Sequence, residues 1–164
     1  MACCVGRCRG KSHRTAKKKQ RRYYSGKKKK HTHKTQLVVG KDGRIICVQI
    51  DKGRKHDFRV FKESKVHIHP AIRSEMDSGY QGIKKYHLNS MVPYKHSKKK
   101  TLTKEQKNHN HTVSSSRVQV EHIIREIKVF KVLGERYRNR RKRFGLRVNL
   151  IAGIYNYELN SVFD

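Results

Sequence analysis

The chain has 164 residues, and 42 lysines and arginines against 12 acidic residues give a formal net charge of +30 at pH 7. This excess of positive charge predicts a polyanionic partner, with nucleic acid as the first candidate. No run of about 18 apolar residues occurs, so we expect no membrane-spanning helix and no membrane partner. No charged segment leads into an apolar leader, which argues against secretion and favours a cytoplasmic protein.

Composition changes along the chain and predicts four segments. Residues 1–41 contain 15 lysines and arginines and no acid. The first 16 of them mix Cys, Arg and Gly without a period, and we expect disorder because such a segment buries too little apolar surface. The predicted segments are a disordered stretch at 1–16, a basic arm at 17–33, a folded domain at 34–159 and a tail at 160–164.

The basic arm has two interpretations. Its lysines and arginines surround Tyr23 and Tyr24, and this mixture is typical of an arm that follows phosphates while its rings stack on bases. The alternative is a solvated basic linker.

The folded segment begins with a predicted β-hairpin. Residues 35–39 and 44–50 are rich in β-branched side chains and flank Gly40-Lys-Asp-Gly43, whose Asp-Gly pair is typical of a hairpin turn. Asp57 stands where a helix N-cap is expected, ahead of an apolar helical pattern. A short helix at 81–87 and a short strand at 90–94 are predicted next.

The C-terminal part is predicted to be helical. Residues 95–111 are polar and form a loop, with a capped helix start at Thr103 left open. Apolar residues then recur every three or four positions and predict a long helix at 116–137. A basic stretch at 136–147 leads into a closing helix at 150–159. This order of elements predicts an α/β fold with a mixed sheet, a β-hairpin and flanking helices.

Two acidic residues are candidates for chemistry. Asp77 ends an extended segment, where a rigid strand could direct a carboxylate at a divalent cation; the alternative is a turn aspartate that accepts a backbone N–H. Glu121 shares one helix face with Arg117, Arg125 and Lys128. That face is either an exposed salt-bridged surface or a metal ligand framed by phosphate-binding cations, and composition leaves both open.

Four stretches carry a resemblance that covers the chain from about residue 17 to 159. They are Tyr24-Ser-Gly-Lys-Lys-Lys-Lys-His-Thr-His-Lys-Thr-Gln36, Gly53-Arg-Lys-His-Asp-Phe58, Asp77-Ser-Gly-Tyr-Gln-Gly82, and the run Glu135-Arg-Tyr-Arg-Asn-Arg-Arg-Lys-Arg-Phe-Gly-Leu-Arg to Leu159. Together they closely resemble the DDE transposases of bacterial insertion sequences. The resemblance implies an RNase H-like fold that presents two Asp and one Glu to a pair of Mg²⁺ or Mn²⁺ ions.

The resemblance assigns roles to the two candidate acids. Asp77 matches the second Asp of the family's triad and Glu121 matches its Glu, which makes both expected catalytic residues and metal ligands. Arg117 and Lys128 match the basic residues of the same signature, while its tyrosine falls at Ser114 and is absent. The DNA-binding residues that this implies are Arg117, Arg125, Lys128, Arg136, Arg138, Arg140, Arg141, Lys142 and Arg143.

The family's first Asp has no counterpart in this sequence. Its aligned place falls at about Arg7, and no acid precedes Asp42. The family usually reads Glu-Arg-Pro where this chain has Arg14-Thr-Ala16, and the codons AGA-ACG-GCC-A read one nucleotide later give Glu-Arg-Pro. We therefore predict that residues 1–16 are translated out of frame, that the RNase H-like fold lacks its first strand, and that at most one ion is weakly held.

These implications lead to a predicted function and an alternative. The prediction is a partial DDE transposase whose intact form binds transposon-end DNA, cleaves phosphodiester bonds with metal ions and transfers strands in the bacterial cytosol or nucleoid. Its partners are double-stranded DNA at the element ends and the target, with self-association possible. Loss of the first Asp predicts that this chain is inactive. The alternative is a non-enzymatic basic remnant that binds DNA or RNA.

Overall fold

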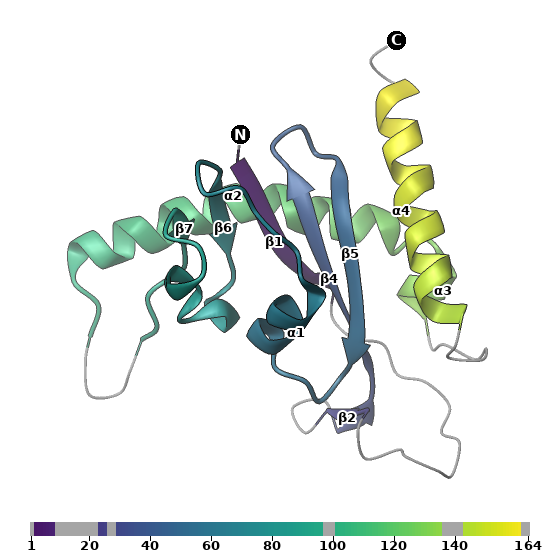
Figure 1. Ribbon diagram of the computed structural model, residues 1–164, viewed down its shortest axis with the longest axis horizontal. Helices are drawn as coiled ribbons and strands as arrows, with labels where there is room; N and C mark the ends of the chain where they lie inside the picture. The colour runs from purple at the N-terminus through teal and green to yellow at the C-terminus, as the bar shows by residue number, and fades with distance from the viewer. Residues whose placement is uncertain (1, 9–22, 26–28, 97–100, 136–142, 162–164) are drawn as a thin grey trace.

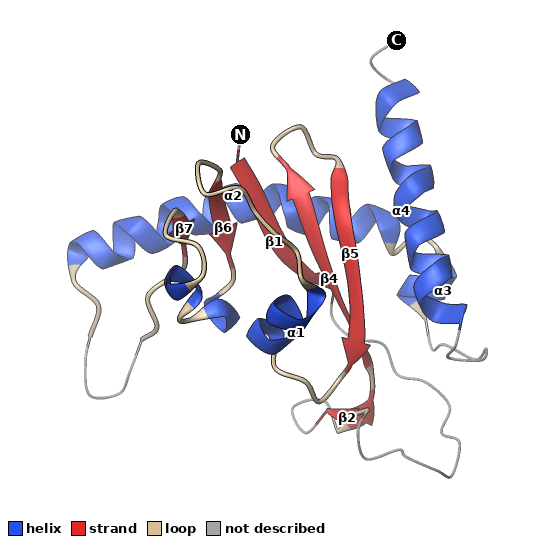
Figure 2. Cartoon of the chain, in the orientation of Figure 1, coloured by secondary structure: helices blue, strands red, loops and turns tan. Residues whose placement is uncertain are grey.

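A computed structural model describes residues 2–8, 23–25, 29–96, 101–135 and 143–161 of the chain. They form a five-stranded mixed sheet with helices on both of its faces (Figures 1 and 2), as the α/β prediction requires. The sheet has the strand order β5-β4-β1-β6-β7. Its strands are β1 (Ala2–Cys8), β4 (His33–Gly40), β5 (Ile45–Lys52), β6 (Arg73–Met76) and β7 (Ser90–Met91).

The helices divide the core into two parts. They are α1 (Asp57–Ser64), α2 (Lys104–Ile127), α3 (Lys131–Gly134) and α4 (Phe144–Ser161). Strand β4 alternates between the two faces of the sheet, because successive side chains of a strand point to opposite sides. Leu37 and Val39 pack in a cluster with residues of α2 and α4, whereas Val38 packs with residues of α1 and of the segment after β6.

The predicted hairpin is confirmed. Strands β4 and β5 pair antiparallel from His33 opposite Lys52 to Val39 opposite Ile45. In the turn, the Gly40 amide donates to the Arg44 carbonyl at 2.9 Å, and Gly43 has a positive φ of 85° that favours glycine.

Strand β1 corrects two expectations about the N-terminal segment. Ala2–Cys8 pair antiparallel with β4 and parallel with β6, so the predicted disorder is wrong for residues 2–8, and the predicted absence of a first strand is not confirmed. Without β1, the facing edges of β4 and β6 would leave a row of unpaired backbone groups in the middle of the sheet. Pairing these edges stabilises a strand at this place whatever its side chains. Residues 9–16 lie outside the described residues.

The long C-terminal helix starts earlier and ends earlier than predicted. Thr103 caps α2 through a reciprocal capping box with Gln106, so residues 104–111 belong to the helix rather than to a loop. The helix ends at Ile127, and α3 follows as a separate turn. On a straight helix Leu133 would lie about 220–260° around the axis from Ile127; the break instead brings Leu133, 8% exposed, into the same core cluster.

Other local predictions are met in part. The basic arm contains a small two-stranded sheet of β2 (Tyr24–Ser25) and β3 (Lys30–His31). Two 3-10 turns, Ser78–Tyr80 and Ile83–Lys85, replace the helix expected at 81–87. Strand β7 is shorter than the predicted 90–94, and the closing helix α4 begins six residues before the predicted 150.

Among the residues that the structure describes, no helix is long and apolar enough to cross a membrane.

Candidate active site

Asp77 lies where strand β6 ends and the chain turns. Its Oδ1 accepts a hydrogen bond from the Ser78 amide at 2.6 Å and caps the 3-10 turn Ser78–Tyr80. The interpretation of Asp77 as a turn aspartate is thus correct about its backbone contact. The carboxylate also remains partly exposed, at 20% for the side chain, so it can contact a second group.

That second group is Arg117 on helix α2. Its Nη1 lies 3.4 Å from Oδ1 of Asp77, and its Nη2 lies 3.8 Å from Oε1 of Glu121, one helical turn further on. The structure therefore brings together the two candidate acids from β6 and α2, and it joins them through a single guanidinium. An Arg placed this way partly neutralises both carboxylates.

The face of α2 that carries Glu121 is polar, as the spacing predicts. Val120, Ile123 and Ile124 are buried against the sheet, while the side chain of Glu121 is 67% exposed. Arg125 on the same helix is exposed and Lys128 is half-buried at the C-cap. The carboxylate of Glu121 is thus accessible to a ligand from solvent and flanked by cations.

Arg7, the position predicted to match the family's first Asp, lies on the strand next to β6. Strand β1 runs parallel to β6 with Val5 opposite Met76, and antiparallel to β4 with Arg7 opposite Gln36. If the parallel pairing of β1 with β6 is continued by one residue, Gly6 lies opposite Asp77. Arg7 is the next residue of β1 after Gly6. The backbone of Arg7 is therefore close to that of Asp77 in the sheet, and the predicted match to the first Asp stays a prediction.

Comparison with known proteins decides the family. The sequence pattern of the DDE superfamily endonuclease family matches residues 2–156. The chain belongs to the DDE superfamily endonucleases. It is 52% identical over 144 residues to a probable transposase for insertion sequence element IS702 from Microchaete diplosiphon, a match that covers 87% of this chain and 52% of the relative. The chain thus spans about half the length of this curated relative. No solved structure matches the chain.

A DDE superfamily endonuclease is expected to use divalent metal ions, and the donor set can be tested against that expectation. Carboxylate oxygens are the ligands that Mg²⁺ and Mn²⁺ favour, and Asp77 and Glu121 supply them. Within the described part of the chain, no group of three His, Cys, Asp or Glu residues could hold a metal ion. The described residues therefore supply two of the carboxylates that such a site needs, with Arg117 between them, and they do not form a three-carboxylate site.

One of the remaining DNA-binding candidates is described, just before α4. Arg143 is exposed immediately before the helix. Arg136, Arg138, Arg140, Arg141 and Lys142 lie outside the described residues. The structure therefore places Arg117, Arg125, Lys128 and Arg143, and the basic stretch at 136–142 stays a prediction.

Sequence reasoning missed an ion pair that supports the turn after Asp77. Asp57 is buried and lies 3.0 Å from Lys34 Nζ; it is the first residue of α1, whose N-cap is His56 rather than the predicted Asp57. A Cβ on Gly79 would meet Asp57 Oδ2 at 3.1 Å. The signal was present in the motifs that contain Lys34, Asp57 and Gly79, but nothing in the sequence showed that they meet.

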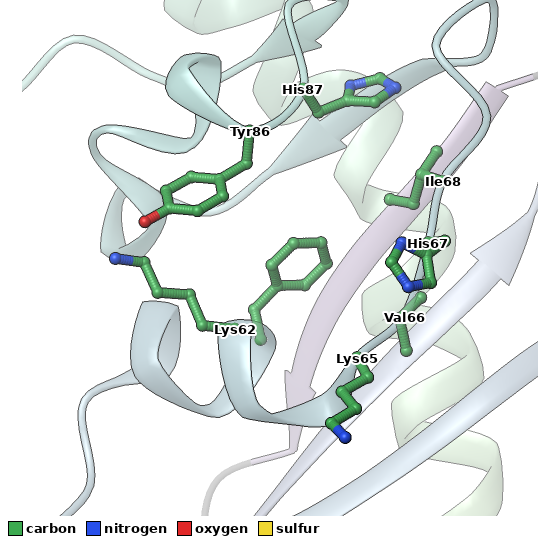
Figure 3. A pocket seen from close by; sticks show the side chains of 8 residues that line it. Lys62, Lys65, Val66, His67, Ile68, Tyr86 and His87 are labelled. Carbon is green, nitrogen blue, oxygen red and sulfur yellow. The ribbon is translucent and has the colours of Figure 1, made fainter.

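A hollow lies between α1 and the segment that follows it, on the sheet face away from α2. It encloses about 240 Å³, and Lys62, His67, Tyr86 and His87 are among the residues that line it (Figure 3). Lys62 Nζ lies 4.6 Å from the centre of the Tyr86 ring, which is a cation–π contact. This hollow is separate from the Asp77–Glu121 pair.

Proposed function

We propose that this chain is a partial DDE transposase that binds transposon-end DNA, and that it does not cleave DNA by itself. In its intact form the enzyme would cleave phosphodiester bonds with metal ions and transfer the strand in the bacterial cytosol. The relative, a probable transposase for an insertion sequence, supports the proposal. It implies double-stranded DNA at the element ends and at the target as substrates.

The proposed fold is RNase H-like. Support comes from a mixed sheet in which β1 is central, with the antiparallel hairpin β4-β5 on one side and the parallel strands β6 and β7 on the other. In an RNase H-like fold, an acid on the first strand and an acid at the end of the parallel strand beside it would meet at one end of the sheet. In this chain β1 has no acid, and Asp77 follows β6. Helix α2, which contacts β1 and β6, would add the third acid.

One observation carries the proposed loss of activity. Two carboxylates, Asp77 and Glu121, are joined through Arg117, and the position aligned with the third carboxylate is Arg7 on β1. Two-metal phosphoryl chemistry needs ligands that hold two ions about 4 Å apart around the attacking and leaving oxygens. Loss of one of the three acids therefore disfavours binding of the second ion.

The chemistry of the remaining pair follows from its residues. Asp77 and Glu121 would hold one Mg²⁺ or Mn²⁺, and a bound ion would polarise the phosphodiester as a Lewis acid. Asp77 is directed by its hydrogen bond from the Ser78 amide, while Arg125 and Lys128 would contact phosphates beside Glu121. Arg117 would exchange its carboxylate contacts for a phosphate when DNA binds.

Cleavage of supercoiled DNA in Mn²⁺ tests the proposal. We expect the chain and its Asp77→Ala and Glu121→Ala variants to nick DNA equally slowly, at the rate of a no-protein control. Cleavage by the chain that Asp77→Ala abolishes would overturn the proposed inactivity.

DNA binding is tested separately by fluorescence anisotropy over a range of salt concentrations. Each phosphate contact contributes a slope of about −0.9 to log K against log salt for duplex DNA. We expect Arg125→Gln and Lys128→Gln each to reduce the slope by about that amount. Glu63→Gln, an exposed change on α1, is the control. An unchanged slope in both variants would contradict a role for this face of α2 in DNA binding.

The alternative function is a basic remnant that binds DNA or RNA without chemistry. The engagement of both carboxylates by Arg117 favours it. Competition between duplex DNA and duplex RNA of the same sequence separates the two proposals. Preference for element-end DNA supports the transposase, and equal affinity for both supports the remnant. Sequencing of the gene upstream of the Lys17 codon tests the proposed frame change, because an aspartate codon must appear in the neighbouring frame.

A further inference from the structure

Helix α4 is apolar on two opposite sides. Its inner side packs into the core through Phe144, Val148, Ile151 and Ala152, which are all buried. Its outer side carries four large side chains at spacings of four, four and three residues. We name them the outer stripe: Leu146, 71% exposed, Leu150, 63%, Ile154, 37%, and Tyr157, 74%.

An outer stripe of this kind is unusual for a helix at the surface. A surface helix normally has one apolar face, and a helix that is apolar all round is normally covered on all sides. Helix α4 lies alongside β5 at the edge of the sheet, with one side turned away from the domain (Figure 1). The stripe spans about 16 Å along the helix and contains no lysine or arginine, so a polyanion does not match it.

The stripe is self-complementary when two copies of α4 pair antiparallel. Pairing by a two-fold axis requires each residue of the surface to face a matching residue of the same surface. When the two-fold axis passes at the level of Ala152, three pairs of residues face each other across it. The midpoint of each pair along the helix lies within one residue of Ala152. These pairs are Leu146 with Tyr157, Leu150 with Ile154, and Arg147 with Glu158.

The centre of the stripe can be approached closely. Gly153 lies one residue from the axis, is exposed, and a Cβ built on it would meet nothing within 4 Å. A glycine at a helix crossing lets two backbones come near each other. A larger side chain there would hold the two helices apart.

The charges at the edge of the stripe also match. Arg147 and Glu158 are eleven residues apart, which places them about 20° apart around the helix, on the same edge. Antiparallel pairing brings Arg147 of each copy toward Glu158 of the other, whereas parallel pairing would place these edges on opposite sides of the interface. In a chain with a net charge of +30, such a charge match is needed to offset repulsion between two copies.

We propose that the outer stripe of α4 is the interface through which two copies of this chain pair antiparallel. The proposal concerns association alone and holds whether or not the chain cleaves DNA. It identifies the face, the orientation and the residues of the contact.

Sedimentation equilibrium of the full chain at high salt, where nucleic acid does not bridge copies, tests the proposal. The chain has a mass of 19.4 kDa, and we expect the average mass to rise toward twice that value with concentration. Leu150→Lys should weaken association at least about tenfold, because it removes two buried leucines per pair. Leu88→Lys is the matched control, since Leu88 is 88% exposed and precedes β7, at the opposite edge of the sheet from β5, and it should change nothing.

The orientation is tested by exchanging charges. Arg147→Glu and Glu158→Arg should each weaken association, and the double variant should restore it, with circular dichroism confirming the helix in each case. A monomer at all concentrations would overturn the proposal, and so would association that Leu150→Lys leaves unchanged. Failure of the double variant to restore association would overturn the antiparallel arrangement.

Discussion

Arg117 Nη1 lies 3.4 Å from Oδ1 of Asp77, so a basic residue of α2 contacts the acid that we propose as a metal ligand. The same guanidinium reaches Glu121. A divalent cation that bound both acids would have to share their negative charge with Arg117. Arg117 would therefore oppose the binding of a divalent cation at this pair.

Removal of the positive charge at Arg117 should strengthen metal binding. Two unit charges 4 Å apart interact by about 1 kcal/mol in water, and the effect on a divalent ion is larger, so we expect Arg117→Gln to raise Mn²⁺ affinity about tenfold. Isothermal titration with Mn²⁺ measures this. Lys62→Gln removes one charge on the other face of the sheet and is the control. Equal affinities in the two variants would show that Arg117 does not compete with the metal.

A second relationship joins α4 to the edge of the sheet. Asn156 Oδ1 accepts from the Ile45 amide at 2.8 Å, and Asn156 Nδ2 donates to the Ile45 carbonyl at 2.9 Å. The side chain thus satisfies both backbone groups of one residue of the edge strand β5. It does for β5 what a neighbouring strand would otherwise do.

Replacement of Asn156 should destabilise the protein. Asn156→Ala removes both hydrogen bonds and leaves two backbone groups unpaired, and we expect a loss of about 2 kcal/mol in the free energy of unfolding. Urea denaturation followed by circular dichroism measures it. Asn149→Ala, at an exposed position of the same helix, is the control and should cost under about 0.5 kcal/mol. Equal losses in the two variants would contradict the importance of this contact.

The ion pair of Lys34 and Asp57 should stabilise the turn after Asp77. Asp57→Ala leaves Lys34 without its carboxylate partner in a half-buried position, and we expect a loss of about 2 kcal/mol. A double-mutant cycle with Lys34→Met isolates the pair, and its coupling energy should exceed about 1 kcal/mol. A coupling energy near zero in urea denaturation would show that the two residues act independently.

The sequence predicted much of the fold, and its failures have physical causes. The hairpin followed from local turn chemistry at Asp42-Gly43, and the cap of α2 was visible at Thr103. The break after Ile127 was not predicted, because apolar residues continue as far as Leu133 although Leu133 lies off the buried face of a straight helix. Strand β1 was missed because it is stabilised by backbone pairing with two other strands, and its composition gave no signal of this.

The candidate site shows the same division between local pattern and long-range contact. Motif spacing singled out Asp77 and Glu121, and the structure joins both to Arg117. The support of Asp57 for the turn at Gly79 depends on residues 22 apart in sequence, and spacing along the chain does not reveal it. Alternation along β4 and the helical period of α2 could be predicted, whereas the contacts between them could not.

Alkaline pH should weaken the contact of α4 with the end of α2. Burial raises the pKa of the Tyr155 hydroxyl, and the negative charge of Glu126 and a hydrogen bond with it raise it further. The pKa of Tyr155 in the folded state exceeds the unfolded value of about 10. Below that pH, Tyr155 therefore makes its whole contribution to the free energy of unfolding. It declines as the pH rises from the unfolded toward the folded pKa.

The difference in unfolding free energy between the chain and Tyr155→Phe measures this contribution. Lysines also titrate near pH 10. Their effect on the unfolding free energy is the same in both proteins and cancels in the difference. We expect the chain to lose stability relative to Tyr155→Phe above pH about 10. Glu126→Gln should reduce that loss, because the amide keeps an acceptor for the Tyr155 hydroxyl without the negative charge that opposes ionisation. A difference that stays constant through this range would show that Tyr155 ionises as easily in the folded protein as in the unfolded chain.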